Sequence, residues 1–115
     1  MRTIILISIF LLGTLSYKAQ DASTKTATLI VSGNCEQCQT RIENAADIKG
    51  VKIASWSSKS KILSVTYNSD KVTIEQIEAA IVAKGHDIGA MKATEASYNK
   101  LPNCCRYRDK KCDVK

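Results

Sequence analysis

Residues 26–38 read TATLIVSGNCEQC, and this stretch decides the fold because the spacing of its apolar residues changes along it. Apolar side chains recur at every second position from Ala27 to Val31, which is the pattern of a half-buried strand. They recur at helical spacing from Cys38 to Ala45. The stretch therefore predicts a strand that leads through a short cysteine-containing loop into a helix.

The elements on the C-terminal side of this stretch complete an α+β pattern. The first helix is expected over residues 37–47, and two runs rich in branched and aromatic residues, 51–57 and 61–67, predict a hairpin. A capping box at residues 73–76 begins a second helix, and residues 86–92 predict a short last strand. This order is that of a ferredoxin-like βαββαβ sandwich, an antiparallel sheet with two helices on one face.

Length and composition indicate one small exported domain. The chain has 115 residues, of which 44% are hydrophobic and 24% charged. Residues 1–19 combine a positive start with a 12-residue apolar run, the layout of a cleaved secretory signal peptide; an uncleaved anchor is the alternative. A linker (20–25), the domain (26–92) and a C-terminal tail (93–115) follow. We expect a periplasmic or secreted protein whose mature form does not span a membrane.

The two cysteines of the loop suit a soft metal ion. At a helix start, free backbone N–H groups and the helix dipole favour anionic sulfur. Two thiolates three residues apart can converge on one ion, and thiolates select Cu(I) or Zn(II) over Mg(II) or Ca(II). Cys38 shares the apolar face of the predicted helix, whereas Cys35 precedes the helix and should be the more exposed sulfur. An incoming partner would therefore meet Cys35 first.

The chain resembles a known family at these residues. A strand, GNCEQC at a helix start, and a second half that ends in AKGHDIG are similar to the heavy-metal-associated domain of copper chaperones and periplasmic mercury-binding proteins. The resemblance covers residues 26–92 and implies that Cys35 and Cys38 bind the metal. The family motif usually reads GMxCxxC, whereas this chain has Ser32 and Gly33 at the first two positions. The family's methionine packs under the loop, so its absence bears on loop rigidity and removes no ligand.

The resemblance further implies an ion, a partner and one more site residue. Cu(I) is the expected ion, with Hg(II) or Zn(II) as alternatives. The expected partner is a metal-transporting membrane protein or another metal-binding domain. His86 follows the glycine that ends the second helix, a position beside the family's metal site, and its imidazole could be a third ligand or a hydrogen-bond donor. A histidine with no metal contact is the other interpretation.

The tail adds three cysteines, Cys104, Cys105 and Cys112, and a short helix is expected before Pro102. Three interpretations stay open. The tail could fold back and bring Cys104 or Cys105 to the loop as further thiolate ligands. Either could form a disulfide with Cys112, as exported proteins often do, or the thiols could be free.

Other functions have weaker support in the sequence. A thiol oxidoreductase is one alternative for the CxxC pair, but Pro102 is the only proline, so a thioredoxin-like cis-proline loop is excluded. A disulfide-stapled interaction domain is the second alternative. The single histidine and the lack of a Gly-rich phosphate loop argue against an enzyme. Scattered basic residues with one Phe and one Trp argue against nucleic-acid binding.

Overall fold

The computed structural model describes residues 23–109. The predicted signal peptide and Cys112 lie outside the described residues. The elements, in chain order, are β1 (Thr24–Ile30), α1 (Glu36–Ala46), β2 (Val51–Trp56), β3 (Ile62–Asn68), α2 (Ile74–Val82), α3 (Glu95–Asn99) and the 3₁₀ turn η1 (Asn103–Cys105).

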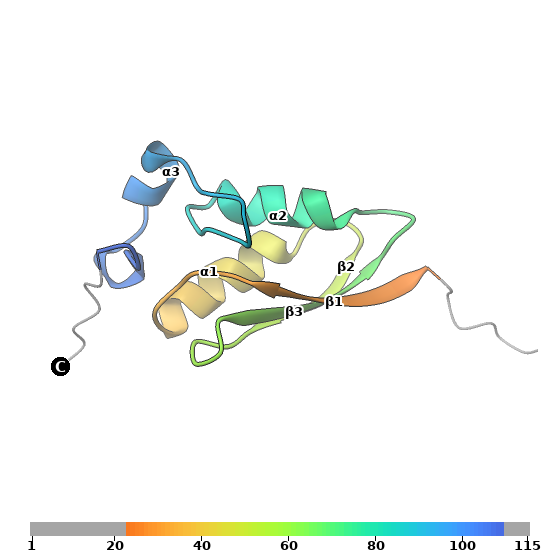
Figure 1. Cartoon of the computed structure of the whole chain (residues 1–115). Helices are drawn as coiled ribbons and strands as arrows, with labels where there is room; N and C mark the ends of the chain where they lie inside the picture. Colours follow the sequence, from red (N-terminus) through yellow and green to blue (C-terminus); the bar gives the residue numbers. More distant parts are fainter. Residues whose placement is uncertain (1–22, 110–115) are drawn as a thin grey trace, which may run out of the picture.

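The three strands form one antiparallel sheet in the order β1-β3-β2, with α1 and α2 on the same face (Figure 1). Val65 in the central strand pairs with Ala27 of β1 and Ala54 of β2. Leu63, Val65 and Tyr67 alternate as the buried residues of β3. The sequence prediction of a ferredoxin-like arrangement with both helices on one face is confirmed.

The continuous last strand predicted over residues 86–92 is not formed. Ile88 makes an isolated antiparallel bridge with Val31, next to the end of β1 where a fourth strand would pair. Ile88 and Met91 then exchange two backbone hydrogen bonds, of 3.0 and 2.9 Å, across a two-residue turn. Gly89 in this turn has a φ of +53°, a conformation that glycine adopts without steric cost and that turns the chain back. Of the expected strand, only Ile88 therefore pairs with the sheet side of the chain, through its bridge to Val31.

Helix α2 begins as the sequence predicts. The Thr73 side chain accepts a hydrogen bond from the Gln76 amide at 3.2 Å, and the Gln76 side chain accepts one from the Thr73 amide at 3.0 Å. This reciprocal pair satisfies two backbone donors that the first turn leaves without helical partners. None of the helices that the structure describes is long and apolar enough to span a membrane.

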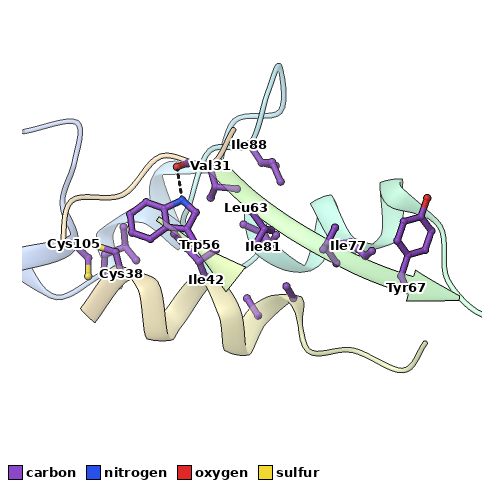
Figure 2. Packing of buried hydrophobic residues seen from close by; sticks show 14 of the residues in the cluster. Val31, Cys38, Ile42, Trp56, Leu63, Tyr67, Ile77, Ile81, Ile88 and Cys105 are labelled. Atoms are coloured by element: carbon purple, nitrogen blue, oxygen red, sulfur yellow. Dashed lines mark hydrogen bonds between the residues drawn. The ribbon is translucent and has the colours of Figure 1, made fainter. Parts of the chain in front are cut away.

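The core lies between the sheet and the two long helices (Figure 2). This core includes Ile42 of α1 and Ile77 and Ile81 of α2, which are fully buried. Trp56, at the end of β2, is also buried, and its indole N–H donates a 3.0 Å hydrogen bond to the carbonyl of Val31. Figure 2 shows Cys38 and Cys105 at the Trp56 end of this core. The core therefore reaches the cysteine loop.

The described part of the tail packs onto the domain. The short helix predicted before Pro102 is confirmed as α3, and Tyr98, Leu101 and Cys105 join the same buried cluster as the helices and strands. Gly85 permits this approach: it has a φ of +99°, and a Cβ there would lie 2.7 Å from the Ser97 carbonyl oxygen. Residues 93–109 are thus packed on the domain.

Candidate metal centre

The cysteine loop holds two separate sulfurs at the start of α1. Cys35 is the N-cap residue in an extended conformation, and Cys38 is buried in the first turn. Their Sγ atoms are 4.0 Å apart, about twice the length of a disulfide bond, so no disulfide joins them in this structure. The Asn34 amide donates to Cys38 Sγ at 3.3 Å. Cys35 is the more exposed sulfur, as predicted.

Trp56 fills the space beneath this loop. A Cβ at Gly33 would lie 3.0 Å from two atoms of the Trp56 six-membered ring and 3.0 Å from the Cβ of Cys38. Contacts that short leave no room for a longer side chain at position 33. The indole therefore occupies the place under the loop that the methionine of the family motif is expected to fill, and its bond to Val31 fixes the ring there.

The tail brings a third sulfur to the pair. The Sγ atoms of Cys35, Cys38 and Cys105 all lie within 4.8 Å of one another. Cys105 ends η1 and is fully buried. Burial raises the pKa of the Cys105 thiol above its usual range, and the neighbouring Cys38 sulfur raises it further. The sequence left open which tail cysteine would approach the loop, and the structure shows that the Cys105 sulfur does.

Cys104 lies at the outer edge of this group. Its sulfur donates a 2.5 Å hydrogen bond to the Gln37 side-chain oxygen and is 4.0 Å from the Cys105 sulfur, so these neighbours share no disulfide. Cys35 Sγ donates to the Cys104 carbonyl at 3.6 Å. An open pocket of about 400 Å³ is lined here by Cys35, Glu36, Gln37, Ser58 and Cys104. The loop sulfur can therefore be reached from this side.

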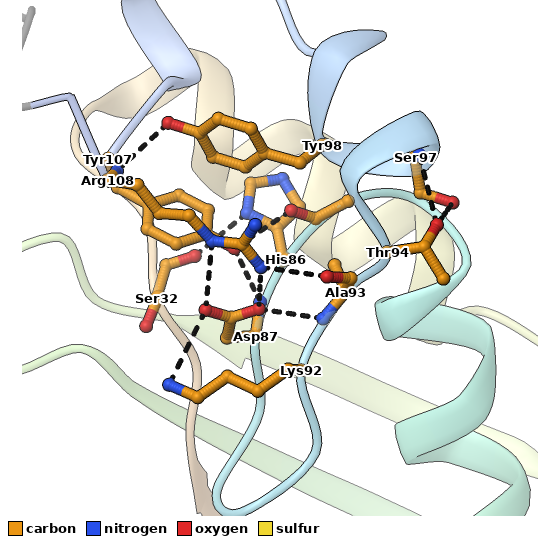
Figure 3. Close-up of polar contacts among 11 residues, drawn as sticks. Ser32, His86, Asp87, Lys92, Ala93, Thr94, Ser97, Tyr98, Tyr107 and Arg108 are labelled. Atoms are coloured by element: carbon orange, nitrogen blue, oxygen red, sulfur yellow. Dashed lines mark hydrogen bonds and ion pairs between the residues drawn. The ribbon is translucent and has the colours of Figure 1, made fainter.

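His86 is outside the three-sulfur group. Its ring is fully buried, its Nδ1 lies 2.8 Å from the Ser32 carbonyl, and it stacks on Tyr107 with ring centroids 5.8 Å apart (Figure 3). Burial lowers the pKa of His86, so the neutral imidazole is favoured, and its Nδ1–H can donate to Ser32. Nε2 has no hydrogen-bond partner among residues 23–109. The contact shown is with the backbone of the cysteine loop, and direct metal binding stays a prediction.

Asp87, Tyr107 and Arg108 form a polar cluster that fastens the tail, which we call the tail latch (Figure 3). The Tyr107 hydroxyl accepts from the Asp87 amide at 2.8 Å and donates to the Gly85 carbonyl at 2.9 Å. The Arg108 guanidinium contacts the Asp87 carboxylate at 2.7 Å. The carboxylate also accepts from the Ala93 amide at 2.7 Å. The Arg108 guanidinium also donates to the Ala93 carbonyl at 2.8 Å, so both ends of the segment from Gly85 to Ala93 are bound to residues that follow Cys105.

Sequence reasoning missed the tail latch. Arg106 to Lys111 reads as a loose basic end, because short charged runs near a terminus are usually solvated. The available signal was the pair of aromatic residues, Tyr98 and Tyr107, on either side of Cys104 and Cys105. In the structure these rings contact edge to face at 5.3 Å, and the Arg108 guanidinium lies 4.5 Å from the Tyr98 ring centroid.

The sequence is similar to those of known metal-binding proteins. No family model matches the chain. Over 56 residues it is 36% identical to the copper chaperone CopZ of Staphylococcus epidermidis, a match that spans 48% of this chain and 82% of that protein. Over 88 residues it is 33% identical to the periplasmic component of the mercuric transport protein of Shewanella putrefaciens, across 75% of this chain and 93% of that protein.

A solved structure of a CopZ metallochaperone shares the fold. It matches with a TM-score of 0.55 and 31% sequence identity, and the match covers 56% of this chain and 100% of that one.

Proposed function

The chain belongs to the heavy-metal-associated domain family, and from this premise we propose that it binds one soft metal ion between Cys35 and Cys38 and passes the ion to another protein. The observation that carries the proposal is the pair of separate sulfurs, 4.0 Å apart at the N-terminus of α1. A metal–thiolate bond is about 2.3 Å long, so two sulfurs that share an ion are at most about 4.6 Å apart. The pair is already within that limit.

We propose Cu(I) as the ion, with Hg(II) the main alternative and Zn(II) a third. Thiolate ligands suit all three. The similarity to a copper chaperone supports Cu(I), and the similarity to a mercuric transport component supports Hg(II). Structural zinc sites usually enclose the ion with four ligands, whereas this pair lies beside an open pocket. That opening fits an ion that is handed on.

Transfer would proceed by ligand exchange at the exposed side of the loop. A thiolate of the partner would approach through the pocket, bond to the ion beside Cys35, and replace the protein's sulfurs one after the other. The partner proposed is a metal-transporting membrane protein or another metal-binding domain. The predicted signal peptide and the periplasmic relative support export to the periplasm or beyond. This activity is binding and exchange and makes no change in a substrate's covalent bonds.

A competition titration tests this proposal. The reduced protein is titrated against a chromophoric Cu(I) chelator, and then the loaded protein is mixed with a second copper-binding domain to follow transfer. Cys35→Ser and Cys38→Ser should each weaken Cu(I) binding by at least about 100-fold, since even the loss of an outer-shell contact costs 10- to 100-fold. Thr40→Ala, at an exposed position on α1, is the matched control and should bind as the wild type does. Equal affinity in the two cysteine variants and the control would refute the proposed site.

A further inference from the structure

We propose that Cys105 is the third sulfur ligand of this site, so that the ion is held in a three-coordinate thiolate centre closed by the tail. The proposal rests on the function proposed above and gives it a specific coordination. It is carried by the position of the Cys105 sulfur, which lies within 4.8 Å of both loop sulfurs and comes from a segment outside the βαββα unit.

The spacing of the loop sulfurs fits three ligands better than two. With bonds of about 2.3 Å, two sulfurs on opposite sides of an ion are about 4.6 Å apart, whereas three sulfurs around an ion in one plane are about 4.0 Å apart. The Cys35 and Cys38 sulfurs are 4.0 Å apart. The Cys105 sulfur lies within 4.8 Å of both loop sulfurs, close to the spacing of about 4.0 Å that such a triangle needs.

The surroundings of Cys105 also fit a ligand. Both Cys38 and Cys105 are fully buried at the Trp56 end of the core, so two of the three sulfurs are shielded from water (Figure 2). Cys35 alone of the three faces the pocket. Negative charge from three thiolates would be offset in part by the Asn34 amide and by the N-terminal end of α1. The ion would thus be enclosed on the core side and open on one side.

The tail latch holds Cys105 in this place. Tyr107 follows Cys105 by two residues, and its hydroxyl bridges the backbone of Gly85 and Asp87. Arg108 adds the ion pair to the Asp87 carboxylate. These contacts involve no sulfur, so the latch can be weakened while every cysteine remains. Release of the ion would then depend on how readily the tail lifts, in addition to attack at Cys35.

X-ray absorption spectroscopy of the full chain loaded with one equivalent of Cu(I) tests the proposal. We expect three sulfur neighbours in the wild type, two in Cys105→Ser with shorter Cu–S bonds, and three in the adjacent variant Cys104→Ser. Two sulfurs in the wild type would overturn the third ligand while leaving the proposed function intact. Loss of a sulfur in Cys104→Ser but not in Cys105→Ser would overturn the assignment. A wild type that binds no Cu(I) would instead refute the proposed function.

Tyr107→Phe provides a second test that changes no sulfur. It removes two hydrogen bonds of the latch, and Cu(I) should leave this variant for a chelator about tenfold faster than it leaves the wild type. The same substitution in a Cys105→Ser background should change the rate little, because the tail no longer holds a ligand. An equal acceleration in both backgrounds would contradict the link between the latch and Cys105.

Discussion

Replacing Gly33 with methionine should destabilise this protein, although methionine is the usual residue of the family motif at that position. A Cβ at position 33 would lie 3.0 Å from the Trp56 ring and from the Cβ of Cys38, and the remaining side-chain atoms would have to enter the space that the indole fills. Overpacking of this kind costs about 1–3 kcal/mol. We therefore expect Gly33→Met to lower the free energy of unfolding by about 2 kcal/mol.

The double variant Gly33→Met/Trp56→Ala tests whether the Trp56 indole causes the destabilisation by Gly33→Met. Trp56→Ala alone should cost about 3–5 kcal/mol, because it empties a buried site and removes the bond to Val31. In Gly33→Met/Trp56→Ala the methionine can occupy part of the vacated space, so the combined loss should be smaller than the sum by about 1–2 kcal/mol. Urea unfolding followed by circular dichroism measures all four proteins, including those without a tryptophan. If the losses in free energy of unfolding were additive, the idea that Trp56 occupies the space of the family's methionine beneath the loop would be refuted.

Three other outcomes follow from the contacts of α2 and the tail. Thr73→Ala should lower the free energy of unfolding by about 1 kcal/mol, because the Gln76 amide loses its acceptor; unchanged stability in urea would show that the cap contributes nothing. Arg108→Gln should speed amide hydrogen exchange in α3 and leave β3 unaffected, and equal rates in α3 would count against the latch. Burial alone would raise the pKa of Asp87, but the hydrogen bonds from Arg108 and the Ala93 amide outweigh it and lower that pKa. The latch should therefore be fully formed above about pH 3.9, the pKa of an unfolded aspartate, and weaken as the pH falls toward the lowered folded value. Amide hydrogen exchange in α3 should therefore speed up at low pH in the wild type but not in Asp87→Asn. The same pH dependence in both proteins would contradict this role of the Asp87 carboxylate.

Local patterns were sufficient for the elements that form from neighbouring residues. The change of apolar spacing between Val31 and Cys38 predicted β1 and α1, and the capping box at Thr73 predicted the start of α2. Each of these signals depends on contacts within a few residues. The exposure of Cys35 relative to Cys38 followed from the same helical register.

What depends on long-range packing was not visible in the sequence. Residues 86–92 were predicted to form a strand, yet the turn at Gly89 leaves only Ile88 paired, with Val31 just beyond the end of β1. The position of Cys105 is set by Tyr107 and Arg108, which bond to residues about 20 positions earlier in the chain. No short motif encodes such contacts, so the sequence could name the tail cysteines as candidates but could not choose between them.

Native mass spectrometry with limiting Cu(I) tests the central claim most directly. The reduced wild type should carry one copper per chain in the presence of a weak competing chelator. The double variant Cys35→Ser/Cys38→Ser, which keeps Cys104 and Cys105, should carry none under the same conditions. One copper on the double variant at the wild-type chelator concentration would contradict the account.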